Sequence, residues 1–182
     1  MNPADVNQQL LAHVREVPDF PQPGILFFDL NPIYADHALF ETLVSALHAE
    51  LATVIDPSTV DFVVGPDARG FIAGTRLAAS LSCGFLATRK PDKLPPPVES
   101  ISYGLEYGES ILELSAHMSL AGAKVVVHDD VLATGGTAAA SAALLKAAGA
   151  EVAAFSFSLE VAALNGAAAL PAGVPVATVL SA

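Results

Sequence analysis

A run of apolar residues that leads into two aspartates and a string of small residues constrains this 182-residue chain most. Residues 124–128 read Lys-Val-Val-Val-His and predict a buried strand, which Asp129 and Asp130 follow directly. Residues 133–137 then read Ala-Thr-Gly-Gly-Thr, and the next segment predicts a helix over 137–148. Open parallel sheets bind their ligands at the carboxyl ends of the strands. The segment therefore predicts a parallel sheet with a ligand site at its edge.

The rest of the chain alternates in the same way between strand-like and helix-like segments. Further strands are expected at residues 25–28, 60–64, 84–88, 110–114, 152–159 and 176–180, and further helices at 2–17, 36–51 and 71–80. Strands and helices that alternate with short connections favour a mainly parallel, twisted sheet flanked by helices on both faces. No repeat or linker composition interrupts the pattern, so residues 1–182 are expected to form a single α/β domain.

Residues 91–105 do not follow either pattern. They contain Pro91, Pro95, Pro96 and Pro97 and show no apolar period, which predicts one long loop. Loops of this length inside a compact domain are often functional lids, so we expect a mobile loop over the site.

The apolar content of the chain suggests a membrane protein at first sight. The hydrophobic fraction is 53% and the mean hydropathy +0.53, but much of this is alanine in short runs. No stretch reaches the roughly 20 apolar residues that a spanning helix needs. The first residues lack the basic start and apolar core of a signal peptide. A soluble, cytoplasmic protein without a membrane partner is expected.

The charge of the chain is strongly acidic and its few cations are clustered. The formal net charge is -11, from 8 Lys plus Arg against 19 Asp plus Glu, which disfavours binding to nucleic acid. One 25-residue window contains Arg69, Arg76, Arg89, Lys90 and Lys93. The clustering indicates a site for a small anion, with a scatter of surface charges as the alternative.

The small residues after the two aspartates have the chemistry of a phosphate site. Their backbone N–H groups and hydroxyls can surround a phosphate at the start of a helix, whose dipole favours an anion. Asp129 and Asp130 would repel that phosphate if they faced it, but they can accept hydrogen bonds from a ribose diol or help to hold Mg²⁺. The run is neither a P-loop nor a Gly-x-Gly-x-x-Gly turn. A tight turn with surface aspartates is the alternative.

Residues 125–137 resemble the signature with which type I phosphoribosyltransferases bind 5-phosphoribosyl 1-diphosphate (PRPP). The resemblance extends over nearly the whole chain to the adenine phosphoribosyltransferase family. The matching segments are VPDFP at 17–21 with PGI at 23–25, GPDARGF at 65–71, RKPDKLP at 89–95 and SYGLEYG at 102–108. In that family they correspond to the N-terminal segment, the pyrophosphate loop and the two ends of the mobile catalytic loop.

The resemblance implies a reaction and its partners. A member of this family forms AMP and pyrophosphate from adenine and PRPP, and it uses Mg²⁺. The metal is expected to be held mainly by PRPP and water, with no direct protein ligand. A homodimer is also implied. Two other functions stay open: transfer to another purine, and a catalytically silent PRPP-binding regulator.

The resemblance also assigns roles to individual residues. PRPP is expected to contact Asp129, Asp130, Ala133, Thr134, Gly135, Gly136, Thr137, Asp67, Ala68, Arg69, Lys90, Lys93 and Tyr107. Catalytic roles fall to Glu106, which manages a purine proton, and to Arg69 and Lys90, which stabilise the departing pyrophosphate. The base is expected to contact Leu26, Phe28, Glu106 and Val161, with residues 1–35 contributing to its pocket.

Several of these residues have a simpler interpretation. Lys93 and Glu106 could be solvated side chains, Val161 a core valine, and Tyr107 an aromatic side chain packed under a loop. We expect His128 to be a packed strand residue and not a base. The chain also departs from the family pattern at Phe28, where an arginine is usual; backbone groups near this position can still bind the amino edge of adenine.

Overall fold

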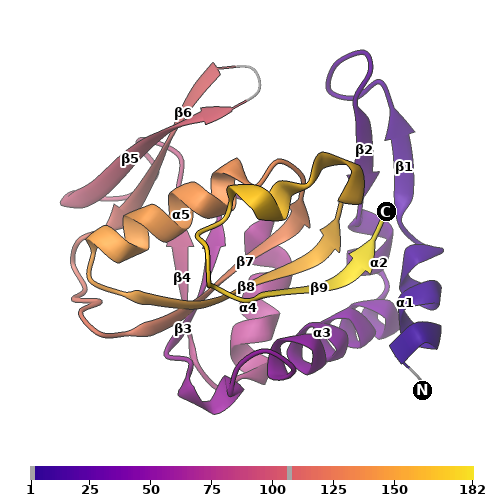
Figure 1. The fold of residues 1–182 in the computed structure, drawn as a ribbon, viewed down its shortest axis with the longest axis horizontal. Coiled ribbons are helices and arrows are strands. Elements are labelled where there is room, and N and C mark those ends of the chain that lie inside the picture. The colour runs from indigo at the N-terminus through magenta and orange to yellow at the C-terminus, as the bar shows by residue number, and fades with distance from the viewer. Residues whose placement is uncertain (1–2, 106–107) are drawn as a thin grey trace.

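The centre of the molecule is a five-stranded sheet in which every strand is parallel to its neighbours. The computed structural model describes residues 3–105 and 108–182. The strand order is β4-β3-β7-β8-β9, as Figure 1 shows. The strands are β3 (Phe62–Pro66), β4 (Gly84–Thr88), β7 (Lys124–Leu132), β8 (Glu151–Glu160) and β9 (Val176–Ser181).

Helices α3 (His37–Ala52) and α4 (Gly70–Ser80) cover one face of this sheet. α3 begins where the side chain of Asp36 accepts a hydrogen bond from the backbone N–H of Leu39, at 3.0 Å. Its leucines recur every four residues, so they form one apolar stripe that is buried against the sheet. The stripe consists of Leu39, Leu43, Leu47 and Leu51.

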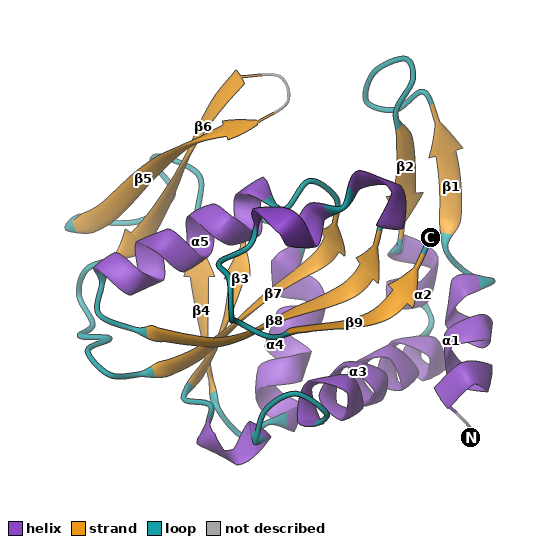
Figure 2. Cartoon of the chain, viewed as in Figure 1, coloured by secondary structure: helices purple, strands orange, loops and turns teal. Residues whose placement is uncertain are grey.

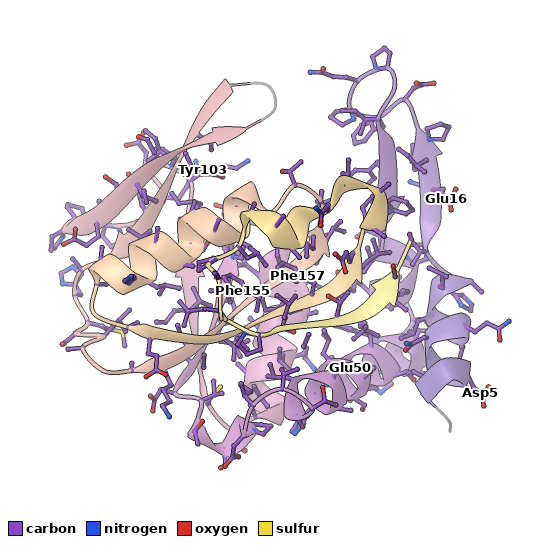
Figure 3. All side chains as sticks on the ribbon, in the orientation of Figure 1. Asp5, Glu16, Glu50, Tyr103, Phe155 and Phe157 are labelled. Atoms are coloured by element: carbon purple, nitrogen blue, oxygen red, sulfur yellow. The ribbon has the colours of Figure 1, made fainter. Side chains whose placement is uncertain are left out.

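Helix α5 (Gly136–Ala147) covers the opposite face. Three of its six buried residues are alanines, which allow the helix to lie close to the sheet, with Leu144 and Leu145 filling the core. Phe155 and Phe157 of β8, labelled in Figure 3, pack on this side. Both are almost fully buried. The short helices η2 (Ala162–Leu164) and η3 (Gly166–Ala169) follow β8, and η1 (Pro57–Thr59) precedes β3.

Two antiparallel hairpins project from the molecule in the direction in which the strands of the sheet point, as Figure 2 shows. One consists of β1 (Arg15–Pro18) and β2 (Leu26–Asp29). The other consists of β5 (Val98–Leu105) and β6 (Gly108–Ser115). The N-terminal hairpin is joined to the body by α1 (Pro3–Leu11) and α2 (Asn31–Ala35). Both hairpins therefore flank the edge at which the sequence predicts the ligand site. In the described part of the chain no helix is long and apolar enough to cross a membrane.

Two sequence predictions of secondary structure are wrong. The helix expected over 2–17 ends at Leu11, and the valines at its far end belong to the turn and strand that follow. The loop expected over 91–105 contains β5, because Ile101 and Tyr103 alternate and pack beside the buried Leu112 and Leu114 of β6. The four prolines before β5 conceal this alternation. In addition, β7 is longer than residues 124–128 and includes both aspartates.

Candidate functional site

The small residues after β7 form a cradle at the start of α5. Residues 133–137 join the strand to the helix and line a cavity of about 160 Å³ together with Arg69, Asp129 and Phe157. Gly135 caps α5 with φ +80°, a backbone conformation that residues with a side chain rarely adopt. A side chain there would overlap the carbonyl oxygen of Gly166 in η3. The turn therefore depends on a backbone-to-backbone contact between these two glycines.

The two aspartates are neighbours near the end of β7. Asp129 lines the cradle, whereas Asp130 is 3% exposed and pairs with Arg69, whose Nε is 3.1 Å from its Oδ2. The other oxygen of Asp130 accepts the backbone N–H of Val131 at 2.9 Å. Burial raises the pKa of Asp129, and the charge of Asp130 raises it further. Burial also raises the pKa of Asp130, against which the charge of Arg69 acts.

Arg69 lies just before α4. It connects the acid pair, Asp129 and Asp130, to the apolar ring of Phe27. Its guanidinium carbon lies 4.9 Å from the centre of the Phe27 ring while its Nε contacts Asp130. The side chain is thus engaged within the protein. A contact between Arg69 and a diphosphate stays a prediction.

The carboxyl ends of β3 and β4 bring a second charged pair together. Arg89 donates from Nε to Oδ2 of Asp67 at 2.8 Å, and its guanidinium lies over the ring of Phe71 at 5.5 Å. Burial raises the pKa of Asp67, but the hydrogen bonds from Arg89 and from the backbone of Lys90, with their charges, lower it overall. Lys90 and Lys93 follow β4 and are exposed. The sequence places Arg89 among clustered cations, but it gives no signal for its pairing with Asp67.

An apolar cavity of about 270 Å³ adjoins the cradle. Leu26 and Phe28 of β2 line it from the N-terminal hairpin, and Val161 lines it from the end of β8. The other lining residues are Ile25, Phe27, Arg69, Val131, Ala133, Thr134 and Leu164. Phe28 is 7% exposed and packs into the core, so mainly the backbone of this residue is available to a ligand. Sequence reasoning missed Phe27, Val131 and Leu164, because nothing in their local pattern indicates a shared cavity.

The β5–β6 hairpin reaches the cradle through Tyr103, which Figure 3 labels. The Tyr103 hydroxyl lies 3.5 Å from Oγ1 of Thr137 at the start of α5. Glu106 and Tyr107, which follow β5 in the sequence, lie outside the described residues. The roles predicted for these two residues stay predictions.

Comparison with known proteins shows to which family this chain belongs. Residues 33–168 match the phosphoribosyl transferase domain family. An adenine phosphoribosyltransferase from Synechococcus sp. (strain JA-3-3Ab) is 50% identical over 171 residues, which are 94% of this chain and 96% of the relative. The chain belongs to the adenine phosphoribosyltransferase family.

Solved structures of adenine phosphoribosyltransferases have the same fold. The crystal structure from Rhodothermus marinus DSM 4252 superposes with a TM-score of 0.91 at 41% identity and covers 98% of this chain and 99% of that one. The enzyme from Saccharomyces cerevisiae, complexed with adenine and an imino-altritol bisphosphate, gives 0.91 at 36% identity, with 97% and 99% covered. The fold class expected from the sequence and the resemblance to adenine phosphoribosyltransferases are confirmed.

The Mg²⁺ that adenine phosphoribosyltransferases are expected to use can be tested against the residues present. Within residues 3–105 and 108–182, no group of three or more His, Cys, Asp or Glu side chains could hold a metal. Asp129 lines the phosphate cradle, and Asp130, paired with Arg69, is its neighbour in β7. Magnesium in phosphate sites commonly uses one or two carboxylates plus phosphate oxygens and water. The residues therefore fit a metal that arrives with the substrate.

Proposed function

We propose that this chain transfers the phosphoribosyl group of PRPP to adenine and forms AMP and pyrophosphate. The observation that carries the proposal is that the apolar cavity and the phosphate cradle share one wall. Arg69, Val131, Ala133 and Thr134 line both. A flat apolar base and a phosphate can therefore bind side by side, with Asp129 in the wall of the cradle, as the two ends of a nucleotide require.

The relatives support adenine as the base. The Saccharomyces cerevisiae enzyme has been crystallised with adenine, and the Giardia lamblia enzyme, at 32% identity, with 9-deazaadenine. In this chain β2 pairs with β1 alone among the described strands, so half of its backbone N–H and C=O groups face away from the hairpin. Backbone groups at Leu26 and Phe28 are the proposed partners of the amino edge of adenine, in place of an arginine at position 28.

In the proposed mechanism, the cradle binds the 5-phosphate and the acid pair binds the ribose hydroxyls. N9 of adenine attacks C1 of the ribose with inversion while the bond from C1 to the diphosphate oxygen breaks. Positive charge then develops on the ribose, and Asp129 and Asp130 stabilise it. Arg69 and Lys90, with Asp67, Ala68 and Lys93 beside them, are the proposed contacts of the departing pyrophosphate. Bound Mg²⁺ would neutralise charge on the diphosphate.

The direct test is AMP formation from PRPP, Mg²⁺ and adenine, with hypoxanthine and guanine in parallel. AMP from adenine, with little product from the other bases, is the expected result. A product from hypoxanthine or guanine alone would favour a different purine. Binding of PRPP without turnover of any base would favour a silent regulator. We also propose a homodimer and a cytoplasmic location; light scattering in solution tests the first.

Glu106 is the proposed residue for the N9 proton. Glu106→Ala is expected to lower kcat by about 10²–10⁴-fold, because a positioned acid or base contributes that much. The KM for PRPP should change little, since the cradle is untouched. Glu99→Ala, which removes an exposed carboxylate from β5, is the matched control. Steady-state kinetics on both variants checks the prediction, and an unchanged kcat in Glu106→Ala would exclude the proton role.

Tyr103 is expected to help the hairpin close over the cradle. Tyr103→Phe removes the hydroxyl that approaches Thr137 and should raise the KM for PRPP about 2- to 10-fold, the effect of one neutral hydrogen bond. The KM for adenine should stay the same. Ser102→Ala, at the exposed neighbouring position, is the control. Equal KM values for PRPP in Tyr103→Phe and Ser102→Ala would contradict the expectation.

A further inference from the structure

Asp67 places a carboxylate in the pyrophosphate loop, residues 65–71, whose proposed ligand is itself an anion. Like charges at short range repel each other, so a carboxylate that faced a diphosphate would weaken its binding. The side chain is only 14% exposed, and its Oδ2 lies 2.8 Å from Nε of Arg89. The exposed residues of the loop are the next two, Ala68 and Arg69. The carboxylate of Asp67 therefore has its role inside the protein.

Asp67 makes three hydrogen bonds to the chain at the end of β4. Its carboxylate accepts one from Nε of Arg89 and one from the backbone N–H of Lys90. Its own backbone N–H donates to the carbonyl oxygen of Thr88 at 2.9 Å. One residue of the loop thus holds three consecutive residues, 88–90, and these include a cation that is proposed to stabilise the departing pyrophosphate.

Arg89 extends this connection to the β5–β6 hairpin. Its backbone N–H donates to the carbonyl oxygen of Glu113 in β6 at 2.8 Å, and the N–H of Glu113 donates to the carbonyl oxygen of Arg89 at 2.7 Å. Its guanidinium lies 5.5 Å from the centre of the Phe71 ring, at the other end of the pyrophosphate loop. A planar guanidinium can pair with a carboxylate and lie over a ring at the same time. Asp67 and Arg89 together therefore connect the loop, the end of β4 and the hairpin.

We propose that Asp67 is a positioning residue: its carboxylate fixes Arg89 and the backbone of Lys90, so that Lys90 reaches the diphosphate from a fixed place beside the pyrophosphate loop. The inference rests on the proposed function, since it concerns the pyrophosphate half of that site. The backbone of Asp67 stays a proposed contact of pyrophosphate, and its carboxylate is not one. The side chain of Lys90 is exposed and flexible, and a fixed backbone reduces the conformational entropy that is lost when it binds the ligand.

The direction of one effect tests this role. Asp67→Asn removes the negative charge with little change of shape. If the carboxylate only lay near the ligand, its loss would strengthen the binding of an anion. A positioning role predicts the opposite: the Kd for pyrophosphate with Mg²⁺ present should rise about 10-fold, the order expected for a hydrogen bond between charged groups. Calorimetry measures this Kd, and unchanged or tighter binding in Asp67→Asn would overturn the inference.

A double-mutant cycle tests whether the two side chains act as one unit. Arg89→Met is expected to weaken pyrophosphate binding by a similar factor. The variant that combines Asp67→Asn with Arg89→Met should bind pyrophosphate about as well as the weaker single variant, because each change alone already removes the pair. Fully additive losses would show that Arg89 contacts the ligand independently of Asp67, and they would contradict the proposal.

Steady-state kinetics gives a second readout for Asp67→Asn. The KM for PRPP should rise and kcat should fall, because the variant loses the fixed place of Lys90. The KM for adenine should stay the same, since neither Asp67 nor Arg89 is among the residues that line the base cavity. Equal increases in both KM values would indicate a general loss of structure and count against a positioning role.

An ion pair of the same kind, between Arg76 of α4 and Glu41 of α3, provides the matched control. The guanidinium of Arg76 lies 6.0 Å from the centre of the Phe40 ring, and neither member of the pair lines the cradle or the base cavity. Arg76→Met should leave pyrophosphate binding unchanged. A loss as large as that in Arg89→Met would show that the effect is not specific to the pair at the loop and would overturn the inference.

Two further comparisons keep the test decisive. If Asp67→Asn does not fold, Arg89→Lys replaces it, since it keeps the charge but lacks the Nε donor and the planar group. This variant should also weaken pyrophosphate binding, and wild-type affinity would refute the positioning role. If the wild type binds pyrophosphate but converts no purine, the proposed function fails, and the binding comparison still decides the role of Asp67.

Discussion

Gly135→Ala is expected to lower the free energy of unfolding by about 3 kcal/mol and to weaken PRPP binding severely. The residue has φ +80°, and an alanine in that conformation costs about 1–2 kcal/mol. In addition, its Cβ would overlap the backbone oxygen of Gly166, which no side-chain rotation can relieve. Overpacking of this kind typically costs a further 1–3 kcal/mol or so. Because residue 135 belongs to the cradle, the displaced backbone would also lose its geometry for a phosphate.

Substitutions of two other glycines serve as comparisons for Gly135→Ala. Gly122 has φ +76° but nothing within 4 Å of an added Cβ, so Gly122→Ala should cost only the conformational part, about 1–2 kcal/mol. Gly166→Ala creates an overlap with the carbonyl oxygen of Ala133 without a positive φ. Urea denaturation of the three variants measures the costs, and calorimetry measures PRPP binding. If Gly135→Ala and Gly122→Ala were equally stable, the contact with Gly166 would not hold the cradle.

The second large effect concerns pH and the fully buried His128. Its Nδ1 lies 3.3 Å from Oγ of Ser156, and its Nε2 has no partner among the described residues. Burial lowers the pKa of His128 from 6.5 to about 4. In the unfolded chain His128 therefore binds a proton below about pH 6.5, whereas in the folded protein it binds one only below about pH 4. As pH falls through this window, His128 should remove about 3 kcal/mol of stability, at 1.36 kcal/mol for each pKa unit.

Other groups titrate in the same pH range. The contribution of His128 is therefore measured as the difference in pH-dependent stability between the wild type and a variant without this ring. The raised pKa values of Asp129 and Asp130 act in the opposite direction, because buried carboxyls that hold a proton stabilise the fold as pH falls. His128→Asn removes the buried imidazole and should show a smaller loss of stability between pH 7 and pH 4. His37→Asn, at an exposed position, is the control. Equal pH slopes for wild type and His128→Asn would show that burial of this ring does not govern acid stability.

The central sheet was predictable because its strands carry their own signal. The valines of β7 and the aromatic residues of β8 are local patterns that predict buried parallel strands without knowledge of their neighbours. The strand expected at 110–114 lies within β6, but β5 was not predictable, because its alternation has meaning only once it pairs with β6. The N-terminal helix was overextended for a related reason: Val14 continues a helical period by coincidence, and only the pairing of β1 with β2 decides against it.

The same distinction separates the site residues that the sequence predicts from those that it does not. The aspartates and the cradle follow one another in the chain, so a reading of residues 129–137 indicates their proximity. The pairing of Asp67 with Arg89 joins two strands that are 22 residues apart in sequence, and the sequence does not indicate it. The lining of the base cavity by Leu164 is likewise a result of folding. Glu106 and Tyr107 rest on the family resemblance alone.

The shared wall between cavity and cradle has a consequence for how this family can diverge. The groups proposed for the sugar and its phosphate are encoded mostly in one stretch, 129–137, so most single substitutions there alter several contacts at once. The base cavity shares residues 131–134 with that stretch, but the rest of its lining comes mainly from 25–28 and 161–164, and its outer wall is a two-stranded hairpin outside the main sheet. Substitutions in that hairpin, such as the phenylalanine at position 28, can accumulate over evolutionary time without disturbing the donor site. The preference for a purine base can therefore change during evolution while the PRPP site stays the same.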